Sequence, residues 1–375
     1  MKTLPFLFTL LFTVFSFFGC SGSSSRPPEN PDALINRSPE ILQVNPESHI
    51  NNQPQSFSAP FRQPIETGFS SEHVMVLLPL EKKIAVISQD GKVLQVYRSR
   101  QEIQSGSWSS VGSRAVFLTR GQGNTRKISI IGLNGGLSME MESRNISSPT
   151  ISGKGDFIAY TSYNDGEFRL NLVSLPSGKI KSVFQLRTEG IAASELLARS
   201  RPVISPNGKW VAFSCYTGRH FNVFVWDNEK SIVRNITRNE GVFVEPVFSP
   251  NGKYVAYLSR EENTQIFIIR NDGRGRKRLT FIPGAKRSVS FSPDGKKIAF
   301  ISQYKNIHRI YTMNLNGDEL KVLRSTRRRI TGCQFLTKDT LVFQTPNGVY
   351  ALSLKNDSVK RLMSGEFSSI ALPGR

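Results

Sequence analysis

Short apolar stretches separated by polar turns fill most of the chain from about residue 73 onward. The stretches are rich in β-branched and aromatic residues, as in Tyr254 to Ser259, and Gly, Pro, Asn or Asp residues bound them. Such short, turn-bounded runs are typical of β-strands rather than helices. The pattern therefore predicts an all-β fold.

One stretch recurs with few changes. Ser249 to Ser259 reads Ser-Pro-Asn-Gly-Lys-Tyr-Val-Ala-Tyr-Leu-Ser, and similar copies begin at Ser205 and Ser292. The spacings of 44 and 43 residues match the period of a four-stranded propeller blade. In each copy Pro presets φ early in a turn and Gly accepts a positive φ later, so the flanking apolar strands form a hairpin.

Weaker copies continue this period, which predicts a seven-bladed β-propeller of four-stranded antiparallel blades, with six blades as the alternative. The hairpin Ile84 to Tyr97 aligns with the third and fourth strands of a later unit, Ile310 to Leu323. The first unit therefore lacks its first strand. We predict that Phe367 to Leu372 supplies it, because this closes the ring and removes two exposed edges. An insertion, Arg187 to Ser200, predicts a short helix around residues 192–198.

The N-terminus has the features of an export signal. Lys2 precedes an apolar run, Leu4 to Phe18, that is too short to span a membrane. Gly19-Cys20 resembles a bacterial lipobox, which implies lipidation of Cys20; a soluble secreted protein is the alternative. We predict a signal peptide over residues 1–19, a lipidated and flexible linker over 20–71 and a propeller over 72–375.

The three central repeats (205–214, 249–259 and 292–302) resemble the TolB-type β-propeller repeat, a relative of the WD-repeat blade. The likeness extends over roughly residues 72–373. TolB-like proteins bind envelope proteins, including a peptidoglycan-associated lipoprotein, so the resemblance implies an interaction platform in the cell envelope, most simply at the outer membrane on its periplasmic or surface side. TolB carries an α/β domain ahead of its propeller, and we expect none here because the segment before Glu72 is short and polar.

The net charge is +20, which favours an anionic partner or surface. An exported, membrane-anchored monomer rarely meets nucleic acid, so we expect none. The four histidines show no metal-ligand spacing, and no Gly-x-Ser-x-Gly elbow is present. We therefore predict a non-enzymatic protein without cofactor or metal. Two alternatives stay open: a propeller hydrolase or lyase that acts on an acidic sugar polymer, and adhesin-like binding of anionic host or matrix polymers.

Basic residues from adjacent blades are expected on the face that carries the loops between the second and third strands and the connections between blades. They suit carboxylate or phosphate groups, although a solvated charged surface explains them equally well. Cys215 and Cys333 are too far apart in the repeat to form a disulfide and are predicted to be buried thiols. The predicted partner-binding residues are Lys286, Arg287, Lys305, His308, Arg309, Arg327, Arg328 and Arg329.

Overall fold

The computed structural model describes residues 40–42, 73–78, 81–109, 114–123, 125–132, 137–175, 177–238, 241–260, 263–364 and 369–371. The predicted signal peptide, the lipidation site at Cys20 and most of the predicted linker lie outside these residues. Among the described helices, none has the length and apolar character needed to cross a membrane.

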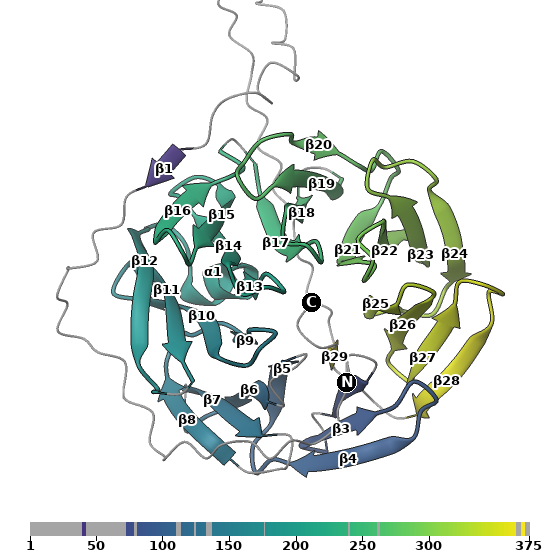
Figure 1. Ribbon diagram of the computed structural model, residues 1–375, viewed down its shortest axis with the longest axis horizontal. Coiled ribbons are helices and arrows are strands. Elements are labelled where there is room, and N and C mark those ends of the chain that lie inside the picture. Colours follow the sequence, from purple (N-terminus) through teal and green to yellow (C-terminus); the bar gives the residue numbers. More distant parts are fainter. Residues whose placement is uncertain are drawn as a thin grey trace, which may run out of the picture. The chain divides into compact units, whose positions relative to one another are not determined.

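Within the described residues, seven antiparallel sheets form the blades of a ring, six with four strands and one with a fifth strand added at its outer edge (Figure 1). The four strands of each blade are given from inner to outer. Blade 1 contains β29 (Ser369–Ala371), β2 (Val74–Leu78), β3 (Lys83–Ile87) and β4 (Val93–Arg98). Blade 2 contains β5 (Ile103–Trp108), β6 (Arg114–Arg120), β7 (Arg126–Gly132) and β8 (Leu137–Ser143). Blade 3 contains β9 (Thr150–Ile151), β10 (Phe157–Asn164), β11 (Glu167–Ser174) and β12 (Ile180–Arg187).

The remaining four blades follow the same order. Blade 4 contains β13 (Val203–Ile204), β14 (Trp210–Tyr216), β15 (Phe221–Asp227) and β16 (Ile232–Asn235). Blade 5 contains β17 (Phe243–Phe248), β18 (Tyr254–Ser259), β19 (Gln265–Arg270) and β20 (Lys277–Arg278). Blade 6 contains β21 (Ala285–Phe291), β22 (Lys297–Tyr304), β23 (Ile307–Asn314) and β24 (Lys321–Thr326). Blade 7 contains β25 (Gly332–Thr337), β26 (Thr340–Thr345), β27 (Gly348–Ser353) and β28 (Val359–Ser364).

The repeated turn is held by its serine. In blade 5 the Ser249 hydroxyl donates to Oδ1 of Asn251 (2.8 Å) and accepts from the backbone N–H of Tyr254 (3.0 Å). Gly252 has a φ of 68°, which suits glycine. The same contacts recur around Ser205 and Ser292. The predicted hairpins are therefore confirmed in all three central repeats.

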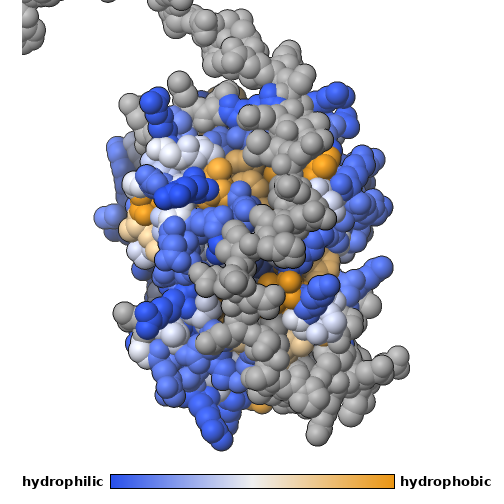
Figure 2. Space-filling model, turned by 90° about the vertical axis from the view of Figure 1, so that its left-hand side faces the viewer, coloured by the Kyte–Doolittle hydropathy of each residue, from blue (hydrophilic) through white to orange (hydrophobic). Residues whose placement is uncertain are grey.

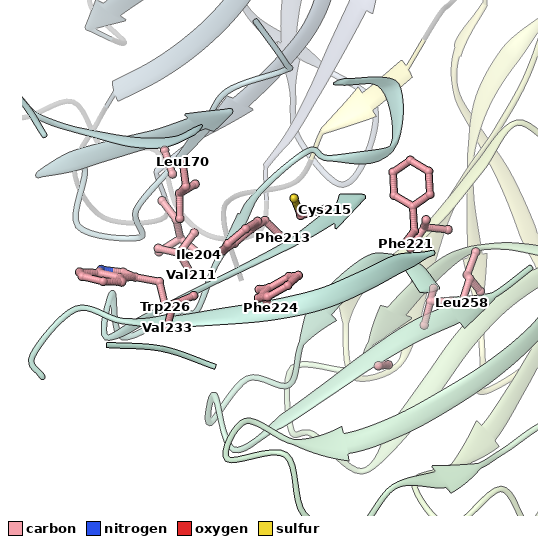
Figure 3. Close-up of a cluster of buried hydrophobic side chains, with 14 of the residues drawn as sticks. Leu170, Ile204, Val211, Phe213, Cys215, Phe221, Phe224, Trp226, Val233 and Leu258 are labelled. Carbon is pink, nitrogen blue, oxygen red and sulfur yellow. The ribbon is translucent and has the colours of Figure 1, made fainter. Parts of the chain in front are cut away.

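The cores lie between the blades, where side chains of neighbouring sheets interlock. In the largest core the rings of Phe213 and Phe224 stack with centroids 5.6 Å apart, and Cys215 lies beside them (Figure 3). Cys333 is buried in a separate core, and both cysteines are free thiols, as predicted. Burial raises the pKa of the Cys333 thiol to about 12. On the side of the molecule seen in Figure 2, the described surface is mainly hydrophilic, with hydrophobic residues between the polar ones.

The ring closes within blade 1, where β29 from the end of the chain pairs with β2 from the start. Three residue pairs define the register: Met75 with Ala371, Val76 with Ile370 and Leu77 with Ser369. This confirms the composite blade and the count of seven. The flanking residues of the predicted closing strand, 367, 368 and 372, lie outside the described residues.

Two additions depart from the simple repeat. The predicted helix is α1 (Ala193–Arg199), which lies between blades 3 and 4 and buries Leu196 and Leu197. A further strand, β1 (Glu40–Leu42), pairs antiparallel with β16 and makes blade 4 five-stranded. This strand lies in the segment that the sequence suggests is a linker, so at least this part of it adopts a defined backbone.

Candidate binding face

The predicted binding residues gather at one edge of blade 6 and at the entry to blade 7. The register pairs Lys286 at the start of β21 with Ser302 near the end of β22, and His308 at the start of β23 with Thr326 at the end of β24. Arg329 lies in the connection from β24 to β25. We call this side of the ring, which carries the turns between second and third strands and the connections between blades, the top face.

Arg287 of β21 organises the described contacts of this region. Its Nη2 donates to Oε1 of Gln303 (3.0 Å) and lies 2.9 Å from Nδ1 of His308. His308 is buried, and its pKa is lowered by that burial and by the charges of Arg287 and Arg329. The imidazole is therefore neutral at pH 7, and Nδ1 accepts the hydrogen bond when Nε2 carries the proton.

Three blades contribute charges around Arg287. Burial is the largest cause that lowers the pKa of Arg287. The charge of Arg329, from the blade 7 side, lowers this pKa further, and the charge of Glu245 of blade 5 raises it. The guanidinium nonetheless stays charged, as arginine does in proteins. Glu245 also forms an ion pair with Arg260. We call the four residues Glu245, Arg260, Arg287 and Arg329, together with His308, the top-face cluster; it carries three guanidinium groups and one carboxylate.

Bulges in two inner strands shape this region. The register shifts between Val244 and Val247 in β17, where Glu245 has a φ of 56°. The equivalent shift in β21 places Ser288 at a φ of 55°. The Ser288 hydroxyl accepts from the N–H of Cys333 (2.8 Å) and donates to its carbonyl (2.9 Å), which joins β21 to β25. Bulges of this kind redirect side chains next to functional sites.

The other predicted residues differ in their surroundings. Lys286 is only 2% exposed and its ammonium donates to the carbonyls of Ile282 and Gly284, so it holds the connection into blade 6. Burial, with a smaller contribution from Arg278, lowers the pKa of Lys286 to about 8. Arg309 is half-buried on β23. Three further residues are exposed at this edge: Lys305, Arg327 and Arg328.

Sequence reasoning missed two members of the top-face cluster, Glu245 and Arg260. A signal was present, because Glu245 is the one charged residue in the otherwise apolar stretch from Phe243 to Phe248. Glu245 reaches the cluster because of the bulge in β17, and Pro246 is the only sign of that bulge in the local sequence. Within the part of the chain that the structure describes, no group of three His, Cys, Asp or Glu residues could hold a metal ion.

The seven blades, joined into a closed ring, define a β-propeller. Residues 132–333, more than half of the chain, match the TolB beta propeller domain. The chain therefore belongs to the TolB β-propeller domain family, as the repeats suggest. A search of the curated proteins found no match.

Solved structures share the fold at low identity. TolB from Acinetobacter baumannii has 18% identity and a TM-score of 0.48, with 65% of this chain and 61% of that chain covered. An oligogalacturonate lyase in complex with manganese has 15% identity and a TM-score of 0.53, with 69% and 76% covered. A prolyl endopeptidase has 13% identity and a TM-score of 0.60, with 85% and 50% covered. The likenesses to the lyase and the endopeptidase show the fold alone, and function is argued from the site.

Proposed function

We propose that the protein is an exported, lipid-anchored, non-enzymatic interaction platform that binds an acidic segment of another envelope protein on its top face. Membership in the TolB β-propeller domain family supports an envelope role. The predicted signal peptide and the lipobox-like Gly19-Cys20 support an anchor, with the outer membrane as the proposed site.

The convergence of Arg287, His308 and Arg329 from two adjacent blades is the observation that carries this proposal. Among the residues that the structure describes, the carboxylate whose charge acts on Arg287 is Glu245, and it is already paired with Arg260. The top-face cluster therefore has surplus positive charge. Guanidinium groups present paired N–H donors in a fixed fork, so they bind a carboxylate of a partner with defined geometry.

The test is a pull-down from detergent-solubilised envelope with the wild type and with Arg327→Glu/Arg328→Glu/Arg329→Glu. The control variant, Lys253→Glu/Lys296→Glu/Lys297→Glu, makes the same change in net charge at exposed positions in the first-to-second-strand turns and at the start of β22. We expect a protein retained by the wild type and the control and lost with the top-face variant. Equal retention by all three forms would refute the proposed face.

Acidic polymers are the second class of ligand that the top-face cluster suits. The shared fold of an oligogalacturonate lyase makes polygalacturonate a direct probe. Formation of unsaturated sugar products, followed by ultraviolet absorbance, would favour the enzyme alternative over the platform. Salt-sensitive binding to a heparin-like polymer without turnover would instead favour adhesin-like binding, because screening weakens contacts between exposed charges.

A further inference from the structure

The outer strand of blade 1 has an unusually apolar edge. Strand β4 is the last strand of its sheet, and within the described residues no strand pairs with its outer side. Val93, Leu94 and Val96 are 46%, 41% and 47% exposed. Proteins usually protect such edges with charged residues or proline, because the unpaired N–H and C=O groups attract other strands.

Other outer strands of the propeller carry that protection. Strand β24 also exposes a valine, Val322 (46%), but Lys321 and Arg324 lie beside it. Strand β28 has Lys360 and Arg361 in its centre. By contrast, the five residues of β4 from Val93 to Tyr97 carry no charge. The exposed apolar edge is therefore specific to blade 1 among these three blades.

The same propeller shows that an outer edge accepts a fifth strand. Strand β1 pairs antiparallel with β16, with Glu40 opposite Asn235 and Leu42 opposite Val233. The added segment is extended and reads Glu-Ile-Leu, an acidic residue followed by apolar ones. Backbone pairing at an outer edge of this propeller is therefore possible for a further strand.

A cleft of about 1090 Å³ lies beside β4, between blade 1 and blade 2. Gln95 and Tyr97 line it from β4, and Lys127, Ser129 and Glu140 line it from the outer strands of blade 2. Lys127 and Glu140 form an ion pair, and Ser129 donates to the same carboxylate (3.1 Å). In strand addition, main-chain hydrogen bonds provide affinity and pockets for alternate side chains provide specificity. The cleft is placed to supply such pockets.

We propose that the outer edge of β4 binds an extended, apolar segment of a partner protein, flanked by acidic residues, as a fifth strand of blade 1. Lys92, Arg98 and Arg100 are exposed at the two ends of β4 and complement the acidic flanks. They also disfavour a second copy of this chain, because antiparallel pairing of two β4 strands about Gln95 places Lys92 opposite Arg98. This interaction is separate from the top face and does not depend on its proposed function.

The test uses a displayed library of ten-residue peptides with alternating apolar positions between acidic ends. The wild type is compared with Val96→Lys and with Val322→Lys, which changes an equally exposed valine on β24. We expect peptides that bind the wild type and Val322→Lys and that bind Val96→Lys about tenfold or more weakly. Since Val96→Lys adds a positive charge, simple attraction between charges predicts the opposite change.

Hydrogen exchange then locates the bound peptide. We expect slower exchange of amides in β4 and unchanged exchange in β24, because only the added strand covers the β4 edge. Peptides that bind all three forms equally, or a library with no peptide enriched on the wild type, would overturn the proposal. Sedimentation as a dimer that Val96→Lys converts to a monomer would also overturn it, because a second copy would then occupy the edge. Equal thermal stability of the three forms checks that each is folded.

Discussion

Removal of the closing strand tests the architecture most directly. Deletion of residues 367–375 takes away β29 and its three register pairs with β2. Because hydrogen-bonded and non-hydrogen-bonded pairs alternate in an antiparallel ladder, three pairs carry about two to four hydrogen bonds. Each costs about 1 kcal/mol net when lost, so the pairing alone contributes roughly 2–4 kcal/mol. Val76 and Leu77 of β2 are fully buried, and uncovering about 100 Å² of apolar surface around them adds about 2.5 kcal/mol.

A loss of about 5 kcal/mol is a large part of the stability of an ordinary domain. We therefore expect the truncated protein to unfold at much lower temperature and urea concentration, measured by circular dichroism. Truncation after Ala371, which keeps β29, serves as the control and should unfold close to the wild type. An unchanged melting temperature after deletion of 367–375 would refute closure by this strand.

Three further predictions address the turns, the binding face and the anchor. Ser249→Ala removes the acceptor for the Tyr254 N–H and should lower the free energy of unfolding by about 1 kcal/mol. The control, Ser325→Ala at an exposed position of β24, should leave that free energy unchanged. Equal urea midpoints for Ser249→Ala and the wild type would contradict this role of Ser249. The folded-state pKa of His308 lies below 6.5, so the unfolded chain takes up its proton first and stability should fall as pH drops below about 6.5. His308→Gln should reduce that loss in urea titrations, and an identical pH profile would show that another group is responsible. Cys20→Ser should move the protein from the membrane to the soluble fraction, and unchanged fractionation would exclude the lipid anchor.

The blades could be predicted from sequence because their determinants are local. Each central repeat carries its own turn, with Ser249, Asn251 and Gly252 within four positions, and the apolar strands follow directly. The period favours seven such units over six, and the missing first strand of blade 1 identifies the C-terminal segment as its partner. Pairing of β1 with β16 could not be predicted in this way, because three residues carry no pattern and edge pairing depends on distant partners.

The candidate binding face could be predicted only as a location. Strand order places Arg287, His308 and Arg329 at one edge, and the structure brings them together. The direction of each side chain is harder to predict from the sequence, because neighbouring residues of a strand point to opposite sides. Lys286 therefore turns towards the carbonyls of its own connection while Arg287 reaches His308. The bulge that presents Glu245 is likewise a property of the strand pair rather than of the local sequence.

Closure within blade 1 has a consequence for how the protein is made. The pairing of Met75 with Ala371 joins residues near the two ends of the domain, so it forms only after the C-terminal end of the domain has been synthesised. Contacts this distant in sequence slow folding and leave unpaired strand edges exposed in the meantime. A nascent chain that stalls or is clipped near its end would keep β2 open, and such a chain would be a ready substrate for chaperones and proteases.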